Sequence, residues 1–538
     1  MARCGIDLGT TYSAISWYDR YNNRVDTMDL NMLADGQRTA RSVVYYPGSG
    51  QEPVIGETAW NAYRQYPDQV AVGIKRSMGT DYRFKPFDGE EFTPQQVSAE
   101  ILKALVKDAR TALGEDVTEA VITVPAHFGD NERAATEEAG RLAGLKVLAL
   151  LPEPHAAALA YCIEKATEIT DKYLLVYDLG GGTFDVTLIH ATTASNAPNA
   201  LNLKINTLCK RGNCMRGGLD WDRALADIVA EKIAQADGTD VRQDPKNEAA
   251  LMDNCEKGKR QLGRLSSTSI LGDMGQHQVE VTRVEFEART AAFLLETKML
   301  MEQVLDEAEK GIMDENGKKH EIPKEKIQIL ISGGASKMPM VKEMLRTVTN
   351  VPLLEHGNPE LLVTIGAAYW AFLLGDQDGN QAAPTAPRTI PIPVPSDDGK
   401  STQTKDLTVE RPIDIAAYTV GVEVMRPDGQ GNMKPSYCVV VEKNSSSGQK
   451  FEKVLYKTQR GMKEISIVIY KSDEPTDNLD QCTELGTFVL SGLPDGGEKG
   501  EEVLVRMWHD DNLIFLKGEA IDKKTGQKVD IEIKRRQD

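Results

Sequence analysis

The sequence has few cysteines, few histidines and no long apolar run, and each shortage excludes a class of protein. Seven cysteines scattered over 538 residues are typical of reduced thiols rather than a disulfide framework. The closest pair, Cys209 and Cys214, has no two further ligands nearby to complete a zinc site, and the seven histidines form no H-x-x-H arrangement. No run is long enough to span a bilayer and no signal peptide precedes the first strand, so we expect a cytoplasmic protein without a membrane partner.

The sequence also lacks an excess of basic charge. It has 63 Lys and Arg residues against 81 Asp and Glu residues, a formal net charge of −18. Because a protein must neutralise nucleic-acid phosphates with a basic surface, we expect no nucleic-acid partner. The pattern G-x-x-x-x-G-K-[ST] occurs nowhere, so any nucleotide is bound by something other than a P-loop.

Two stretches of the chain have the same design. Residues 6–15 (IDLGTTYSAI) and 176–189 (VYDLGGGTFDVTLI) each have an apolar β-type run, an aspartate, a glycine-bearing turn with hydroxyls, and a second β-type run. Glycine lets the turn approach a ligand closely, and successive turn N–H groups form an anion-binding nest. One such hairpin is as often an ordinary tight turn, but two copies in the same order favour a clamp for a polyphosphate.

The aspartates of the two hairpins, Asp7 and Asp178, indicate a metal. A carboxylate repels a bare phosphate, but it is well placed if a divalent cation that keeps several waters lies between them. The pattern therefore predicts a metal–nucleotide site. A third element, the apolar run 329–332 followed by Gly333-Gly334 and a helix from Met340 to Thr347, presents helix N–H groups in the same way. By itself it is most simply a plain turn between a strand and a helix.

The chain changes character along its length. Residues 1–375 alternate strands and helices, among them an amphipathic helix over Gln95–Leu113 and a helix from a capping box at Thr282 to Lys310. The two hairpins fall in separate halves of this stretch, which predicts a two-lobed α/β body with nucleotide in the cleft. Residues 376–413 are rich in proline and predict an extended, exposed linker. Residues 414–538 hold eight short strand patterns, which predict a β-sandwich.

The chain resembles the 70-kilodalton heat-shock chaperone family, the DnaK-like ATPases. The matching segments occur in family order and at family-like spacing over about residues 3–375, and a weaker resemblance continues to the end of the chain. The resemblance implies an actin-like ATPase body followed by the family's substrate-binding β-domain. The segments are Gly5–Ser13, Ile74–Arg76, Val124–Ala126, Glu153–Tyr161, Asp178–Asp185, Gly217–Asp220 and Gly333–Gly334.

The resemblance implies which residues act on ATP. Lys75 matches the family's catalytic lysine, which neutralises charge developing at the γ-phosphate, and Glu153 matches an acid that orients water and links the lobes. Asp7 and Asp178 match the carboxylates around Mg²⁺, mainly through its waters. The expected catalytic residues are Lys75, Glu153, Asp178, Thr183, Asp185, Asp7 and Thr10.

The implied cofactors are ATP or ADP with Mg²⁺, and K⁺ is a further candidate ion. Glu256, Lys259 and Arg260 match the adenosine-binding helix, where a carboxylate suits ribose hydroxyls and a guanidinium plane stacks on adenine. The expected nucleotide contacts are Gly9, Thr10, Thr11, Tyr12, Gly180, Gly181, Gly182, Thr183, Gly217, Gly218, Glu256, Lys259, Arg260, Gly263, Gly333, Gly334, Ala335, Lys337 and Glu360.

Four of these positions depart from the family. It usually has serine where Gly263 and Ala335 stand, arginine where Lys337 stands and aspartate where Glu360 stands. We expect one lost hydrogen bond to ribose or adenine and a less planar cation beside the base. Nucleotide should still bind, more weakly or with a looser preference for the base.

The β-domain carries residues that match the family's apolar pocket for one extended peptide. Peptide backbone would bond to strand edges while one side chain enters the pocket. The alternative, that these are ordinary inward-facing sandwich residues, is at least as good for Ile467. The expected peptide contacts are Val422, Val424, Met425, Leu455, Ile465 and Ile467.

Two differences limit what the resemblance implies about coupling. The sequence stops shortly after the last predicted strand, so we expect no helical lid. The family's leucine-rich interdomain linker aligns with the charged, proline-bearing stretch Glu410–Ile413, and Leu407–Val409 just upstream is its candidate substitute. A weaker docking strip lowers the coupling free energy between the two sites.

We therefore expect an ATP-dependent chaperone that hydrolyses ATP and binds unfolded or extended apolar polypeptide under nucleotide control. The resemblance implies a J-domain cochaperone and a nucleotide exchange factor as partners. The alternative is a nucleotide-switched adaptor or scaffold that binds one dedicated protein partner. A sugar or acid kinase on the same body is disfavoured, because no distinct sugar-binding acid site is present and the β-domain would be unexplained.

Overall fold

A computed structural model of the chain describes residues 2–197, 199–313, 319–349, 351–354, 357–374, 388–395, 402–416, 418–427, 432–443, 445–446, 448–472, 476–491, 493, 498–509 and 516–532. The chain forms two compact units. The larger comprises Met1–Phe128, Glu132–Ile312 and Lys319–Pro412, and the smaller is built on Ile413–Asp538. None of the described helices is long and apolar enough to cross a membrane.

The first lobe of the larger unit is built on a sheet with the order β11-β10-β1-β2-β3. Strands β1 and β2 are antiparallel neighbours, with Ile6 opposite Ile15 and Asp7 opposite Ala14, which confirms the first predicted hairpin. The strands are β1 (Ala2–Asp7), β2 (Tyr12–Asp19), β3 (Arg24–Thr27), β10 (Val117–Val124) and β11 (Lys146–Pro152).

The second lobe is built on a seven-stranded sheet with the order β20-β19-β12-β13-β14-β22-β21. The central strands β12 and β13 are antiparallel, with Asp178 opposite Asp185, which confirms the second predicted hairpin. The strands are β12 (Asp171–Leu179), β13 (Phe184–Ala197), β14 (Ala200–Asn213), β19 (Ile327–Ser332), β20 (Leu353–Leu354), β21 (Ile390–Pro395) and β22 (Thr402–Val409).

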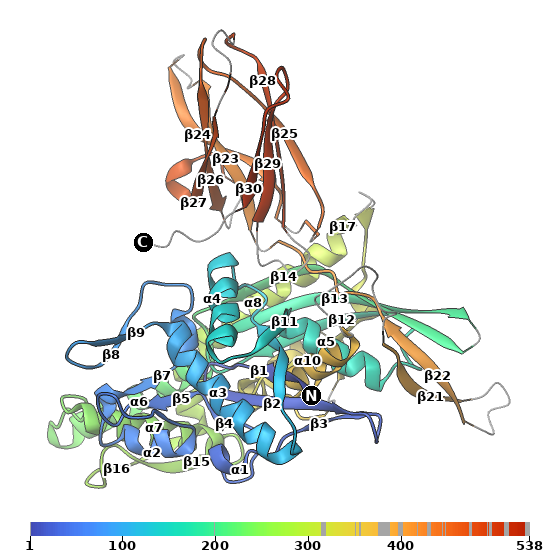
Figure 1. Ribbon diagram of the computed structural model, residues 1–538. Coiled ribbons are helices and arrows are strands. Elements are labelled where there is room, and N and C mark those ends of the chain that lie inside the picture. The colour runs from blue at the N-terminus through green and yellow to red at the C-terminus, as the bar shows by residue number, and fades with distance from the viewer. Residues whose placement is uncertain are drawn as a thin grey trace. The chain divides into compact units, whose positions relative to one another are not determined.

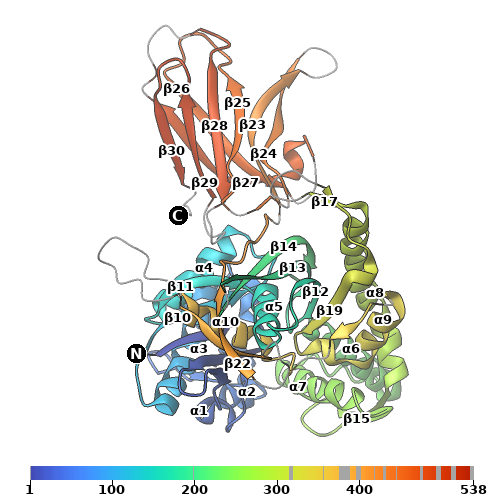
Figure 2. The same ribbon diagram turned by 90° about the vertical axis from the view of Figure 1, so that its right-hand side faces the viewer.

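Strand β12 is apolar on both faces because each face covers a different core. Leu175, Tyr177 and Leu179 pack into one cluster with α6 (Gly218–Asp237), α7 (Pro245–Leu262), α8 (Arg283–Lys310) and α9 (Pro339–Thr349). Leu174 and Val176 pack into another with α5 (Glu153–Glu164) and α10 (Leu362–Leu373). Helices therefore cover both faces of the sheet, as Figures 1 and 2 show.

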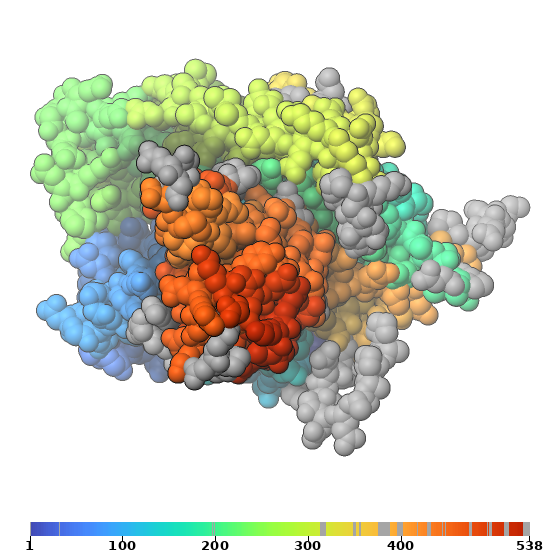
Figure 3. All heavy atoms as spheres, turned by 90° about the horizontal axis from the view of Figure 1, so that it is seen from above, coloured from blue at the N-terminus to red at the C-terminus, as the bar shows by residue number. Residues whose placement is uncertain are grey.

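Helices α5 and α10 join the two lobes. They pack against each other, α10 contacts β1 and β2 of the first sheet, and α5 contacts β12 and β13 of the second. The lobes thus share the core around these two helices. In Figure 3, the green to yellow residues of the second lobe and the blue residues of the first lobe lie on different sides of the larger unit. An interlobe cleft is the expected consequence of two sheets hinged on one shared layer.

The two long helices predicted from capping signals are present. One is α3 (Pro94–Leu113), which begins with a capping box at Thr93 and ends at Gly114 in the left-handed conformation. The other is α8, which begins with the predicted capping box between Thr282 and Glu285. The remaining elements of the larger unit include α1 (Asn31–Ala34), α2 (Glu57–Tyr63), α4 (Asp130–Leu142), β4 (Ala40–Arg41), β5 (Val43–Tyr45), β6 (Val54–Ile55), β7 (Val70–Val72), β8 (Phe84–Phe87), β9 (Glu90–Phe92), β15 (Ser267–Leu271), β16 (Gln278–Thr282) and β18 (Lys319–His320), with β17 (Ile312–Met313) at its boundary.

Two described parts of the segment expected to be an exposed linker are strands instead. β22 runs parallel to the edge of β14, with Leu203 opposite Val409, and β21 pairs with the other side of β22. Leu407 is fully buried, and Ile390 and Ile392 lie in the same core cluster. Composition was misleading because β21 tolerates its prolines on the outer edge of the sheet, where a missing N–H breaks no ladder. The other parts of the predicted linker, 376–387 and 396–401, lie outside the described residues.

The smaller unit is a sandwich of two four-stranded antiparallel sheets, as predicted. One has the order β24-β23-β26-β27 and the other β25-β28-β29-β30, and their inner faces form one apolar cluster that includes Val422, Ile469, Val505 and Met507. The strands are β23 (Thr419–Pro427), β24 (Met433–Val441), β25 (Phe451–Tyr456), β26 (Glu464–Ser472), β27 (Thr483–Ser491), β28 (Glu502–His509), β29 (Leu516–Asp522) and β30 (Lys528–Glu532). Within this stretch, 494–497 and 510–515 lie outside the described residues.

The strand assignment of β22 predicts the effect of Leu407→Ala. Because Leu407 is fully buried in a core cluster of the larger unit, truncation should lower that unit's free energy of unfolding by about 2–5 kcal/mol. Urea unfolding followed by fluorescence measures this, since Trp370 lies in the same core cluster. Thr404→Ala, at an exposed position on the same strand, is the matched control. Equal stability of the two variants would mean that the segment is an unattached linker after all.

Candidate functional site

The tips of the two hairpins meet at the cleft between the lobes. A Cβ at position 181 would overlap Thr11 Oγ1, and one at position 182 would overlap the Thr10 side chain. Only glycine allows the second hairpin to approach the first this closely, so the glycines of the pattern serve the contact between hairpins as well as the turn. Thr11 Oγ1 is buried and has no hydrogen-bond partner among the described residues, as expected of a donor that serves a ligand.

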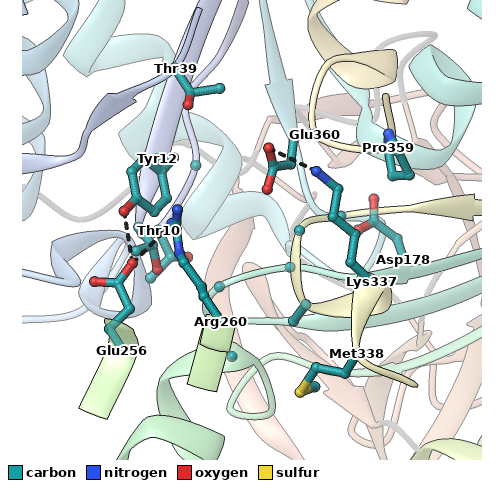
Figure 4. A pocket seen from close by; sticks show the side chains of 18 of the residues that line it. Thr10, Tyr12, Thr39, Asp178, Glu256, Arg260, Lys337, Met338, Pro359 and Glu360 are labelled. Atoms are coloured by element: carbon teal, nitrogen blue, oxygen red, sulfur yellow. Dashed lines mark hydrogen bonds and ion pairs between the residues drawn. The ribbon is translucent and has the colours of Figure 1, made fainter. Parts of the chain in front are cut away.

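A cavity of about 620 Å³ opens beside the hairpin tips (Figure 4). Of the expected site residues it is lined by Asp7, Gly9, Thr10, Thr11, Tyr12, Lys75, Glu153, Asp178, Gly180, Gly181, Thr183, Gly218, Glu256, Lys259, Arg260, Gly263, Gly333, Gly334, Ala335, Lys337 and Glu360. The structure therefore gathers residues from across 350 positions of sequence around one space large enough for a nucleotide.

Three expected residues are not in the cavity lining, and each lies directly behind it. Gly182 and Gly217 are packed against each other at the second hairpin, since a Cβ at position 217 would lie 2.6 Å from the Gly182 backbone. Asp185 lies on β13 opposite Asp178 and is 2% exposed. These residues shape or support the wall rather than form its surface.

The end of the cavity near the hairpins concentrates buried carboxylates. Burial raises the pKa of Asp7 to about 7, and nearby Glu153 adds to the effect while Lys75 opposes it. Burial, with Glu153 and Asp185 as neighbours, also raises the pKa of Asp178 well above its ordinary value. Like charges held together out of water are unfavourable unless a cation compensates them. This end of the cavity is therefore built to receive positive charge.

Lys75 supplies part of that charge. It lies on a short 3₁₀ helix, Ile74–Ser77, and its Nζ is 2.6 Å from Glu153 Oε1. Glu153 is the first residue of α5, where the helix dipole favours a negative side chain. Burial nevertheless raises the pKa of Glu153, and Lys75 opposes this. The pair holds the ammonium group at the cavity wall in a fixed direction.

The donor set fits a hard divalent cation. Asp7 and Asp178 offer two carboxylates with raised pKa values, and oxygen ligands are those that Mg²⁺ prefers. Two protein carboxylates are too few for an octahedral shell, so an Mg²⁺ ion here would keep several waters and take phosphate oxygens as further ligands.

The opposite wall centres on Glu256 of α7. Its carboxylate accepts hydrogen bonds from Tyr12 Oη at 2.7 Å, Arg41 at 2.6 Å and Arg260 at 3.1 Å. Burial alone would raise the pKa of Glu256, but Arg41, Lys259 and Tyr12 together outweigh burial and lower that pKa. The guanidinium of Arg260 lies over the Tyr12 ring (Figure 4). A flat, partly stacked cation and a polar rim are suited to a base and a ribose.

The four departures from the family pattern gather at one side of the cavity. Lys337 Nζ is 3.0 Å from Glu360 Oε2, and both side chains are more than a third exposed, so this pair contributes little to stability. Gly263 and Ala335 line the cavity without a hydroxyl. A Cβ at position 263 would lie 3.1 Å from the Arg260 carbonyl oxygen, a tight contact that a serine could make only with a small shift of the backbone. The expected loss of one hydrogen bond to nucleotide stays a prediction.

Sequence reasoning missed several residues that complete the site. Arg76 donates to the Gly182 carbonyl oxygen at 2.9 Å and to both carboxylate oxygens of Asp220, at 3.2 and 2.6 Å, so it ties the first lobe to the second hairpin and to α6. Asp222 is buried beside Lys259, and burial raises its pKa to about 6. Arg76 and Asp220 lie within the matched segments Ile74–Arg76 and Gly217–Asp220, but the contacts that define the roles of these residues join segments more than 35 residues apart.

The residues expected to bind peptide lie in the smaller unit at different depths. Val422 and Ile467 are buried in the sandwich core, and Val424, Leu455 and Ile465 are half-buried against it. Met425 is 40% exposed. The alternation along β23 places Met425 on the opposite face from Val422 and Val424. The role of these residues in peptide binding stays a prediction.

The cleft with its two hairpins is what a two-lobed nucleotide-binding protein requires. The family model described as "Hsp70 protein" matches residues 3–538. The chain is 32% identical over 499 residues to the "Chaperone protein DnaK" of Thermotoga neapolitana and to that of Thermotoga maritima, with 91% of this chain and 73% of each relative covered. The DnaK of Thermosipho africanus is 32% identical over 500 residues, with the same coverage.

The chain belongs to the Hsp70 family, as its motifs predicted, and is a DnaK-like member of it. Membership implies an actin-like ATPase body followed by a β-sandwich. The mixed α/β larger unit and the all-β smaller unit are consistent with that architecture.

The buried carboxylates Asp7, Glu153, Asp178 and Asp185, here called the acid cluster, predict how stability depends on pH in the absence of ligand. Because the pKa of Asp7 is raised to about 7 in the folded chain, the folded state binds the extra proton between about pH 4 and 7 and loses stability as pH rises through that window. Asp7→Asn removes this loss. In buffer without Mg²⁺ or nucleotide, the variant should be more stable than the wild type by about 1–4 kcal/mol at pH 8 and by much less at pH 4.

Urea unfolding at the two pH values measures the difference. Asp116→Asn is the control, because the Asp116 side chain is 71% exposed and its replacement should shift stability little at either pH. A difference between Asp7→Asn and wild type that does not change with pH would contradict the raised pKa.

Proposed function

We propose that this protein is an ATP-dependent chaperone that hydrolyses ATP in the interlobe cavity and binds extended apolar peptide in its β-sandwich under nucleotide control. The observation that carries the proposal is the meeting of the two hairpins beside the buried group Lys75, Glu153, Asp7 and Asp178. Membership of the Hsp70 family supports it, since the relatives carry the name chaperone. The dedicated-adaptor alternative is not favoured by these comparisons.

The hairpin tips bind the phosphates in this proposal. Backbone N–H groups at Gly9–Thr11 and Gly180–Gly182 and the Thr10, Thr11 and Thr183 hydroxyls surround the triphosphate and align it. When bound, Mg²⁺ neutralises part of the phosphate charge, with Asp7 and Asp178 holding its waters. Binding of Mg²⁺ with ATP also relieves the repulsion that raises the pKa values of these two carboxylates.

Lys75 and Glu153 act on the transferring group. Phosphoryl transfer needs positioning and charge stabilisation more than covalent help from the protein. The Lys75 ammonium, 5% exposed and fixed by Glu153, offers its charge to the γ-phosphate oxygens in a site with little water. Asp185 and Glu153 orient the attacking water by accepting its hydrogen bonds.

The β-sandwich holds the peptide. The half-buried Val424, Leu455 and Ile465 offer apolar surface that the sandwich core does not fully cover, and Met425 offers apolar surface on the other face of β23. An extended peptide would place one side chain against this surface and bond through its backbone. The proposed partners are unfolded polypeptide, a J-domain cochaperone and a nucleotide exchange factor, and the proposed K⁺ would accompany Mg²⁺ at the phosphates.

Lys75→Ala tests the ATPase assignment. Removing a fixed charge that acts mainly in the transition state should slow single-turnover hydrolysis by about 100-fold or more, while the dissociation constant for ATP changes by less than about tenfold. Rapid-mixing hydrolysis and equilibrium titration measure the two. Lys85→Ala, at a side chain that is 61% exposed, is the matched control. Near-normal hydrolysis by Lys75→Ala would remove Lys75 from the mechanism.

Nucleotide control is tested by adding peptide. Single-turnover hydrolysis should rise at least about fivefold with a saturating extended apolar peptide, which corresponds to the low end of coupling energies between sites. Met425→Glu should weaken peptide binding and raise the peptide concentration needed, whereas Val489→Glu, at an equally exposed apolar position on β27, should not. Intact basal hydrolysis with no stimulation at any peptide concentration would leave an ATPase without the proposed coupling.

A further inference from the structure

One histidine of the first lobe, His127, reaches Asp185 on strand β13 of the second lobe. His127 lies in the short loop between β10 and α4. The loop is held on both sides of it, because the Phe128 N–H donates to the Pro125 carbonyl oxygen at 3.2 Å and the buried Arg133 donates to the Phe128 carbonyl oxygen at 3.0 Å. The direction of the His127 side chain is therefore set by a braced turn.

The imidazole of His127 meets Asp185. Its Nδ1 lies 2.5 Å from Asp185 Oδ1, and the His127 and Asp185 side chains are 18% and 3% exposed. An ionised carboxylate only accepts hydrogen bonds, and the histidine tautomer with its proton on Nδ1 is the one that can donate to it. Fixing Oδ1 fixes the plane of the carboxylate, and with it the direction in which Oδ2 accepts a hydrogen bond.

The backbone of β14 is shaped around this pair. Gly212 is the register partner of Asp185. A Cβ at position 212 would lie 2.5 Å from His127 Nδ1 and 2.8 Å from Asp185 Oδ1. The histidine therefore occupies space that a side chain on the neighbouring strand would otherwise fill, which makes the contact a packed feature of the cleft and not a surface encounter.

Asp185 belongs to the acid cluster. It is opposite Asp178 on the neighbouring strand, and its charge raises the pKa values of both Asp178 and Glu153. We propose, on the basis of the function proposed above, that His127 is a positioning residue for ATP hydrolysis: it holds the Asp185 carboxylate in the orientation that aligns the attacking water. Because the two residues belong to different lobes, the carboxylate is aligned only when the lobes are closed.

The donor at Nδ1 is the property to test. His127→Phe keeps a ring but removes the donor, and His127→Asn keeps an N–H close to the place of Nδ1. His190 on β13 provides a matched control, because its Nε2 lies 2.6 Å from Asp171 on β12. This contact is at the end of β12 and β13 that is far from Asp178 and Asp185. His190→Phe therefore removes a similar histidine–aspartate bond from the same sheet, away from the cavity.

Single-turnover hydrolysis and the dissociation constant for Mg²⁺-ATP are measured for the full chain and the three variants. We expect His127→Phe to slow hydrolysis at least about tenfold, His127→Asn to stay within about threefold of wild type, and His190→Phe to match wild type. The dissociation constant should change by less than about threefold in all three, which also shows that each variant is folded.

Three results would overturn the assignment. His127→Phe could hydrolyse ATP at the wild-type rate, in which case the contact is only structural. His127→Asn could be as slow as His127→Phe, in which case a donor at this place is not what matters. His127→Phe could lose affinity as much as rate, in which case the contact holds the lobes and not the carboxylate. Failure of the proposed function is a different observation, namely a wild-type chain that binds ATP without hydrolysing it.

Discussion

The buried carboxylates around Lys75 are the constraint on which the rest of the cleft depends. Asp7, Glu153, Asp178 and Asp185 come from four elements of both lobes, and burial raises the pKa values of the first three. Such a cluster costs free energy while it lacks cations. The fold sustains it because α5 and α10 hold the two sheets together through a shared apolar core. In the proposed function, the Mg²⁺ ion that accompanies ATP supplies positive charge to this cluster, and the cost is recovered as affinity for the metal.

Several ionic contacts join the lobes in the cleft, beside the packed hairpin tips. Lys75 reaches Glu153, Arg76 reaches Asp220, Arg41 reaches Glu256 and His127 reaches Asp185. Partly buried ion pairs depend strongly on distance and geometry, so a small change in the angle between the lobes alters several of them together. In the proposed function, nucleotide binds among these same side chains. A ligand that changes their charge balance would then change the preferred lobe angle, which gives the proposed nucleotide control a physical basis.

The sequence predicted the phosphate side of the site better than the rest. Short glycine turns and aspartates at fixed spacing carry their geometry locally, so the order of residues in 6–15 and 176–189 is enough to assign two hairpins. Arg41, Asp222 and His127 could not be found in this way, because each depends on a partner distant in sequence. The error at 390–395 and 402–409 has a different cause. Proline content predicts an exposed chain, whereas a neighbouring sheet edge with room for Leu407 overrides that tendency.

The pairing of β22 bears on how strongly the two units can be coupled. The strand lies directly before the boundary at Pro412, and the β14 edge to which it bonds continues to Gly212 beside Asp185. In the proposed function, β22 would transmit nucleotide state by exchanging between a paired and an unpaired form. Detaching β22 exposes Leu407 and Val409. It also either breaks the pairing with β21 or moves β21 away with its residues Ile390 and Ile392. Exposing each fully buried side chain costs about 1.5–3 kcal/mol. Inverting a 99:1 equilibrium already requires about 5.5 kcal/mol of differential binding. The hairpin of β21 and β22 therefore favours the attached form more than a single strand would. A nucleotide that shifts this equilibrium would have to favour release of β22.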